Sequence, residues 1–449
     1  MSGTVVLDGG YIATVDGQGT EHADGHIVVT EGRIVSVGAG PAPTVDGARR
    51  IDARGCVVTP GLVNTHNHLY QWATRGMSQQ STLFEWLTEL YPVWAGIDED
   101  VVRATTRAGL TWLARSGCTT AADHHYVFPA NGGDVFGALV HAAKGVGIRL
   151  HAVRGSMDLG QKRGGLPPDH IVETTDGALA ATANAIEEFH DTAAEAMVRV
   201  AVGPCSPFSA SRDLMVKGAE LARERDVRLH THLAETVEEE QQCLAELGAT
   251  PVGYAEQTGW IGPDVWLAHG IHLSAPDVRL IGANRVGVAH CPSSNARLGA
   301  GLAPVRGLLD AGAPVGLGVD GAASNEAGGL VGEVRQALLV ARLRGGPKAL
   351  TAREALWLGT MGGARCLGRE AEIGSIEPGK LADLAVWRVD GLGHAGIADP
   401  VAALAFGSQP PLEHLLVGGE SIVEPGVEDE PEIARDLTVA CRTLAERAR

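Results

Sequence analysis

The segment Thr59-Pro-Gly-Leu-Val-Asn-Thr-His66-Asn-His68 is a short apolar run that ends in two histidines separated by one residue. In an extended strand alternate side chains point to the same face, so we expect His66 and His68 to lie side by side. Two neutral imidazoles in that arrangement can bind a divalent metal ion. A histidine pair alone is weak evidence, because the same spacing also arises on ordinary protein surfaces.

Three more polar residues, His232, His269 and Asp320, also follow short apolar runs. Such runs alternate with helical stretches through the middle of the chain, and the predicted strands are 61–65, 119–123, 148–153, 198–202, 227–230, 265–268, 286–289 and 315–319. This alternation predicts an α/β fold, a parallel (β/α)8 TIM barrel. A doubly wound open sheet is the alternative, but its phosphate fingerprint G-x-G-x-x-G is missing after the first strand.

The two ends of the chain have a different sequence pattern from the middle. Short β-rich runs separated by turn pairs such as Asp8-Gly9 fill the first residues and return near the end, as in an antiparallel sheet. We expect a small β-sandwich domain built from residues 1–58 and 374–430. The barrel would then occupy 59–373, and residues 431–449 would form a charged C-terminal helix on the outside.

The composition excludes several classes of protein. The 449 residues carry a net charge of −18, which argues against a nucleic-acid polymer as partner. Seven scattered cysteines without a C-x-x-C pair argue against a disulfide framework. No apolar run approaches the length of a membrane span, and the N-terminus does not resemble a secretory signal. We therefore expect a cytoplasmic protein without a membrane partner.

The barrel brings the polar residues to one rim, because active sites in this architecture lie at the C-terminal ends of the strands. We predict one divalent metal ion, Zn²⁺ before Fe²⁺, with the ligands His66, His68, His232 and Asp320. A bound divalent ion lowers the pKa of water from 15.7 towards about 7 and so generates hydroxide near neutrality. Asp320 could in addition accept a hydrogen bond from this water.

Glu235 lies three residues after His232. A carboxylate there could simply stabilise the start of a helix, but the shared rim favours a general acid/base. His269 is expected to polarise the attacked centre. A second metal ion in such barrels generally needs a bridging group after strand four, and the segment 198–205 contains no lysine, so we expect one ion. For three histidines the sequence does not decide between lining the pocket and a structural role: His124, His230 and His290.

The sequence resembles the amidohydrolase superfamily, and within it the cytosine/guanine/s-triazine aminohydrolase branch. The matching segments are Pro60–His68, His230–Glu235, Leu267–His269, His290–Asn295, Gly316–Asn325 and Glu377–Leu384. The resemblance covers nearly the whole chain. It implies the same four metal ligands, with Glu235, His269 and Asp320 in catalysis, and it would make a homo-oligomer unsurprising.

More detailed sequence similarities indicate the kind of substrate. The segments around Gln71, His125 and Arg154 are similar to those of 8-oxoguanine deaminases and nearby triazine hydrolases. The resemblance implies that these three residues read the edge of a flat heterocycle, to which an amide and a guanidinium can donate hydrogen bonds. A structural salt bridge is the alternative for Arg154. The Gly/Pro-rich segment 160–169 has the composition of a loop that could cover the pocket.

We therefore expect a metal-dependent hydrolytic deaminase of an amino-substituted aromatic N-heterocycle. The substrate would be 8-oxoguanine or a related purine or pterin, and the product ammonia, with Glu235 moving protons. One alternative is an s-triazine or cyclic-amide hydrolase of the same fold. Another is a binding protein that has lost the chemistry, which the complete ligand set disfavours.

Overall fold

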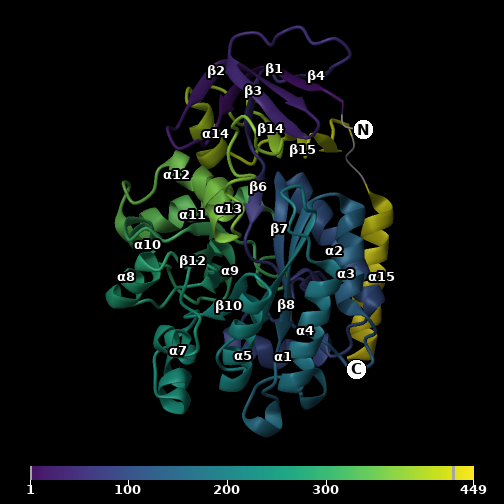
Figure 1. The fold of residues 1–449 in the computed structure, drawn as a ribbon, viewed down its shortest axis with the longest axis vertical. Helices are drawn as coiled ribbons and strands as arrows, with labels where there is room; N and C mark the ends of the chain where they lie inside the picture. Colours follow the sequence, from purple (N-terminus) through teal and green to yellow (C-terminus); the bar gives the residue numbers. More distant parts are fainter. Residues whose placement is uncertain (1–2, 427–429, 449) are drawn as a thin grey trace.

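The computed structural model describes residues 3–426 and 430–448, which form a barrel with a separate sheet above it (Figure 1). Residues 1–2, 427–429 and 449 fall within the predicted sandwich and C-terminal helix ranges and lie outside the described residues. No helix in the described part of the chain is both long and apolar enough to cross a membrane.

Eight parallel strands close into a barrel within the described chain. They follow one another around the ring in chain order, and the last strand returns to the first by pairing Leu317 with Asn64. The strands are β6 (Leu62–Asn64), β7 (Cys118–His125), β8 (Arg149–Ser156), β9 (Val198–Pro204), β10 (Leu229–Leu233), β11 (Val265–His269), β12 (Gly287–His290) and β13 (Val315–Leu317). Each overlaps a predicted strand, so the predicted (β/α)8 barrel is confirmed.

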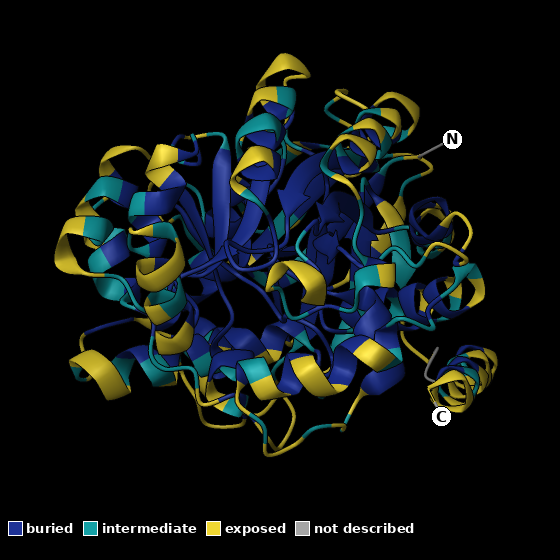
Figure 2. Cartoon of the chain, turned by 90° about the horizontal axis from the view of Figure 1, so that it is seen from below, coloured by how far each residue is buried: buried dark blue, intermediate teal, exposed yellow. Residues whose placement is uncertain are grey.

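The barrel strands form from continuous apolar runs because both of their faces are covered. All residues of β7 and β8 are buried, as expected of parallel strands enclosed by helices. Figure 2 shows these buried strands at the centre and exposed residues on the surrounding helices. The helices of this outer layer include α2 (Glu99–Arg115), α3 (Val135–Val146), α4 (Thr175–Phe189), α5 (Arg212–Glu224), α8 (Ala275–Ala283) and α11 (Leu330–Gly345).

Segments from both ends of the chain form the second sheet, at the top of Figure 1, and this part of the prediction is confirmed. Hydrogen bonds join its strands into one sheet rather than two separate ones, in the order β16-β15-β14-β5-β1-β2-β3 with β4 beside β1. The expected antiparallel pairing is incomplete, because β1 pairs in parallel with both β4 and β5. The strands are β1 (Val5–Ala13), β2 (Glu21–Thr30), β3 (Arg33–Ala39), β4 (Arg49–Asp52), β5 (Cys56–Pro60), β14 (Leu384–Arg388), β15 (Leu412–Val417) and β16 (Glu420–Val423).

The sheet and the barrel are joined covalently and by a buried ion pair. Strand β5 pairs with β14 in the sheet, and β6 of the barrel begins two residues after β5 ends. Arg149 at the start of β8 donates two hydrogen bonds of 2.8 and 3.1 Å to the Asp383 carboxylate beside β14.

The last helix, α15 (Pro431–Arg447), runs alongside α2 in Figure 1, and the Arg447 side chain donates to the Gly96 carbonyl at 2.8 Å.

Candidate active site

The structure brings the predicted ligands and catalytic residues to the C-terminal ends of the barrel strands. His66 and His68 lie in the loop after β6, His232 lies in β10, His269 is the last residue of β11, and Asp320 follows β13. All five are buried. Strand β6 ends at Asn64, so this pair of histidines is held by a loop rather than by the strand that the sequence suggested.

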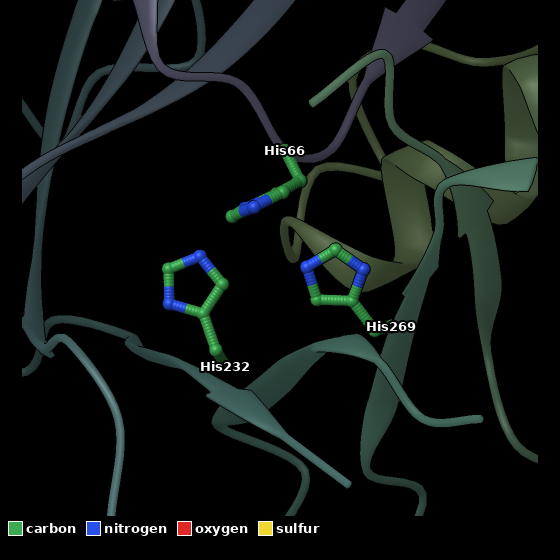
Figure 3. Close-up of side chains that lie close together, drawn as sticks. All are labelled: His66, His232 and His269. Carbon is green, nitrogen blue, oxygen red and sulfur yellow. The ribbon is translucent and has the colours of Figure 1, made fainter. Parts of the chain in front are cut away.

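Donor atoms of the predicted ligands lie close together, and those of His66, His68 and Asp320 all lie within 4.8 Å of one another. His68 Nε2 lies 3.1 Å from His232 Nε2, and Asp320 Oδ1 lies 3.4 Å from Nε2 of both His66 and His68. Nitrogen and oxygen ligands about 2.1 Å from a tetrahedral ion are about 3.4 Å apart, so these distances fit one divalent cation. Figure 3 shows the rings of His66, His232 and His269 directed into the same space from three different elements.

Hydrogen bonds select the tautomer in which each ligand histidine offers Nε2. His68 Nδ1 donates to the His124 carbonyl at 2.7 Å, and His232 Nδ1 donates to the Cys205 carbonyl at 2.6 Å. A carbonyl oxygen only accepts, so Nδ1 carries the hydrogen and Nε2 presents its lone pair to the cluster. The donor chemistry of the site therefore suits a metal ion.

His66 is oriented by another histidine. Its Nδ1 lies 2.8 Å from His230 Nε2, while His230 Nδ1 lies 2.8 Å from the Trp266 carbonyl. Because that carbonyl must accept, His230 Nε2 accepts from His66 Nδ1 and leaves His66 Nε2 for the ion. His66 Nε2 is buried and has no hydrogen-bond partner in the described structure. The sequence did not decide the role of His230, and the geometry makes it the hydrogen-bond partner of a predicted ligand.

The other two open histidines also lie near this site. The His124 ring stacks on the His232 ring with centroids 5.0 Å apart, and His124 Nε2 donates to the Gly203 carbonyl at 2.8 Å. His290 ends β12 and is buried, and neither of its ring nitrogens has a hydrogen-bond partner among the described residues. His124 therefore supports a ligand by packing, whereas the contacts of His290 assign it no role.

The protonation states suit metal binding. Burial lowers the pKa of His68 to about 3 and holds the pKa of His232 well below its ordinary value, which keeps both imidazoles neutral. Burial alone would raise the pKa of Asp320, but the neighbouring His66 and His269 side chains hold it well below its usual range. Asp320 Oδ2 also accepts a hydrogen bond of 2.6 Å from Ser294 Oγ, which leaves Oδ1 directed at the histidines. The donor set is three neutral nitrogens and one anionic oxygen.

Glu235 and His269 form a buried pair beside the donor set. His269 Nε2 lies 3.6 Å from Glu235 Oε2, and His269 Nδ1 donates to Asn295 Oδ1 at 3.0 Å. Burial raises the pKa of Glu235 to about 7, which allows this carboxyl to take up and release a proton near neutrality. Burial would lower the pKa of His269, but the carboxylates of Glu235 and Asp320 raise it above its ordinary value. The pair can therefore exchange protons with a bound substrate.

The backbone at this rim is strained. Ala234, His269 and Asp320 have φ values of +54°, +72° and +61°, in the left-handed region that favours glycine. Each such residue costs on the order of 1–3 kcal/mol and persists only where surrounding contacts hold it. Backbone strain of this kind concentrates at functional sites, and two of these residues, His269 and Asp320, line the cavity over the donor set.

A cavity of about 30 Å³ lies over the donor set. Its polar lining includes Gln71, whose Oε1 is buried without a hydrogen-bond partner in the described residues. The apolar cover comes mainly from α1 (Leu83–Trp94), together with Tyr126, Phe208 and Leu298. The segment 160–169 does not line the cavity, so the prediction that it covers the pocket is wrong. A volume of 30 Å³ holds one or two water molecules.

His125 and Arg154, predicted to contact substrate, do not line this cavity. Arg154 Nη2 lies 2.7 Å from Glu173 Oε1, and its guanidinium covers the Phe128 ring at 3.5 Å. His125 Nε2 donates to the Val127 carbonyl at 2.9 Å. The alternative of a structural salt bridge is therefore the one that the geometry favours for Arg154.

Several residues of the site were not predicted from the sequence. Asn295 and Ser294 contact His269 and Asp320, and both lie in a segment that carried the family resemblance without an assigned role. The apolar cover on α1 has no distinctive signal, because its buried face has the spacing of any helix packed on a barrel.

Known proteins resemble this chain over most of its length. The sequence matches the Amidohydrolase family over residues 57–421. It is 45% identical over 415 residues to 8-oxoguanine deaminase of Pseudomonas aeruginosa, and the match covers 92% of each chain. It is 36% identical over 448 residues to isoxanthopterin deaminase of an unknown prokaryotic organism, covering 94% of this chain and 92% of that one.

The fold is also close to a solved structure. The crystal structure of atrazine chlorohydrolase from Arthrobacter aurescens TC1, complexed with zinc, superposes with a TM-score of 0.92 at 35% identity. The superposition covers 97% of this chain and all of that one. The predicted resemblance is confirmed: the chain belongs to the amidohydrolase family.

Proposed function

We propose that this protein is a metal-dependent deaminase that hydrolyses the amino group of a purine-like heterocycle, with 8-oxoguanine as the first candidate. The observation that carries the proposal is the Glu235–His269 pair, 3.6 Å apart, beside the donor set of three histidines and one aspartate. The identity of 45% to an 8-oxoguanine deaminase and of 36% to an isoxanthopterin deaminase supports a fused bicyclic substrate.

The residues His66, His68, His232 and Asp320 would hold one divalent ion. When bound, such an ion would lower the pKa of a coordinated water and supply the nucleophile near neutrality. Zn²⁺ is our first choice, because the similar atrazine chlorohydrolase was solved with zinc, and Fe²⁺ suits the same ligands.

The protein side chains would move the protons. Glu235, with a pKa raised to about 7, would take the proton of the attacking water and deliver it to the ring nitrogen beside the amino-bearing carbon. It would then take the remaining proton from the added hydroxyl group and pass it to the amino group, which leaves as ammonia while the hydroxyl oxygen becomes the carbonyl oxygen. The raised pKa of His269 favours the imidazolium, whose Nε2–H would donate to the oxygen that becomes the ring carbonyl.

The cavity wall would orient the ring and exclude bulk water. Trp86, Tyr91 and Phe208 present apolar surface to a flat heterocycle, and the unpartnered Oε1 of Gln71 can accept a hydrogen bond from a ring N–H. Closure over the ring would strengthen the electrostatic interactions around Glu235. The predicted cytoplasmic location and self-association stay predictions.

The test is an ammonia-release assay with guanine, 8-oxoguanine, isoxanthopterin, cytosine and aminotriazines, combined with elemental analysis of the same samples. We expect one divalent ion per chain and the highest kcat/KM for a bicyclic substrate. Glu235→Gln should keep the metal and lose about 10²- to 10⁴-fold in turnover. Near-normal turnover in that variant would remove Glu235 from its role.

The second candidate is hydrolysis of an s-triazine, favoured by the close fold of the atrazine chlorohydrolase. A preference for aminotriazines over all bicyclic substrates would replace the first proposal by this one. Absence of ammonia from every substrate, with the metal bound, would refute a deaminase acting on these rings.

A further inference from the structure

Glu239 is a buried acidic residue that the proposed reaction does not use. It lies in the first turn of α6 (Val237–Gln242), and its side chain has no exposure to solvent. Its Oε1 accepts from the Ala234 N–H at 2.9 Å, and its Oε2 accepts from the Glu235 N–H at 2.7 Å. No Lys or Arg forms an ion pair with it among the residues that the structure describes.

This arrangement differs from ordinary helix capping. Thr236 caps α6 by accepting from the Glu239 N–H at 3.2 Å, and in a capping box the glutamate would bond to the N–H of the cap residue in return. Here the carboxylate bonds to the two residues before the cap. The contact therefore serves the turn between β10 and α6, the segment that presents Glu235.

The turn needs such support. Ala234 has a φ of +54°, which is unfavourable for a residue with a side chain. Its carbonyl accepts from the N–H groups of Ile271 and His272 at 2.8 and 2.9 Å, directly after His269. One carboxylate thus holds a strained turn that carries Glu235 on one side and is bonded to the loop carrying His269 on the other.

A purely structural role would not require a carboxyl group here. Glu235 faces His269, Asp320 and Glu239. A neutral residue could pack in this place without the cost of a buried carboxylate. The two hydrogen bonds to the turn therefore favour a role toward Glu235 over simple packing.

We propose that Glu239 is a positioning residue, which orients the Glu235 carboxyl through the two backbone N–H groups of the turn. This inference rests on the proposed deaminase function. Glu239 itself touches no substrate: its whole effect passes through the Ala234–Glu235 turn.

The test compares Glu239→Gln with Glu238→Gln, the same change on an exposed neighbour in the same helix. A glutamine amide in this place can accept from only one of the two N–H groups, so Glu239→Gln should lower kcat about 10- to 100-fold with a KM within threefold of the original value. Metal content should stay at one ion per chain. Glu238→Gln should match the unaltered protein.

Glu239→Asp keeps the carboxylate but shortens its reach, so kcat should fall while KM and metal content stay close to their original values. It also replaces Glu239→Gln if that variant does not fold. The inference is overturned if the folded variants keep kcat within twofold, or if activity falls only in proportion to lost metal. A failure of the proposed function shows instead in the unaltered protein, which would then release no ammonia from any substrate.

Discussion

Replacing His230 by asparagine is expected to weaken metal binding, although His230 is not a predicted ligand. His230 Nε2 accepts from His66 Nδ1, and His230 Nδ1 donates to the Trp266 carbonyl. An asparagine amide reaches about as far as Nδ1 and can keep the bond to Trp266, but it loses the bond to His66. A glutamine amide reaches about as far as Nε2, so His230→Gln can keep the acceptor for His66.

The expected magnitude follows from burial. His66 and His230 are fully buried, so water does not replace the lost acceptor, and the hydrogen of His66 is free to move to Nε2. Loss of such a partner typically lowers metal affinity 10- to 100-fold, which corresponds to about 1.4–2.7 kcal/mol. His230→Gln should lose less than tenfold.

The assay is competition between the metal-free protein and a chromophoric chelator for Zn²⁺, with the dissociation constant as readout. His151→Asn is the matched control, because His151 is buried in the same barrel beside the Trp266 ring and contacts none of the predicted ligands. It should leave the Zn²⁺ affinity within twofold. Equal affinities for His230→Asn, His230→Gln and the unaltered protein would refute the orienting role of His230.

Three other predictions concern stability. Removing the metal with a chelator should lower the melting temperature measured by calorimetry, because an ion at 100 times its dissociation constant stabilises the fold by about 2.7 kcal/mol; an unchanged melting temperature would argue against a resident ion. Arg149→Met should destabilise the protein by about 3–5 kcal/mol in urea, since it leaves the buried Asp383 carboxylate unpaired, and a loss under 1 kcal/mol would contradict this. Burial raises the pKa of Glu333 to about 7, so the folded state binds the extra proton and stability falls as pH rises from about 4.5 to 7. Glu333→Gln should flatten that fall in urea unfolding series, and an unchanged slope would show that Glu333 does not cause it.

The barrel and the position of its polar residues were predictable from the sequence for one physical reason. Buried parallel strands must be apolar, so each strand appears as a short hydrophobic run, and the polar residue that ends the run marks the carboxyl end of the strand. The ring then brings His66, His68, His232 and Asp320 together without further information. The structure then adds the distances of 3.1–3.4 Å between donor atoms, which strand positions alone do not give.

The contacts beyond the strand ends were harder to predict from the sequence. Glu173, the partner of Arg154, lies 19 residues further along a loop whose path no local pattern determines. The helix that covers the cavity carries its apolar face as any barrel helix does. The bond from Glu239 to Ala234 depends on a left-handed residue that is not glycine, for which the sequence has no marker.

The closure of the barrel brings together His66 and Asp320, which follow the neighbouring strands β6 and β13 but are far apart in the chain. Asp320 N–H donates to the His66 carbonyl at 3.1 Å, next to the one residue pair, Leu317 and Asn64, that registers β13 against β6. An ion bound by His66 and Asp320 would therefore bridge the two strands, β6 and β13, whose pairing closes the barrel. In the metal-free protein, hydrogen exchange should begin at this pairing. During synthesis, the donor set is complete only after the chain has passed residue 320.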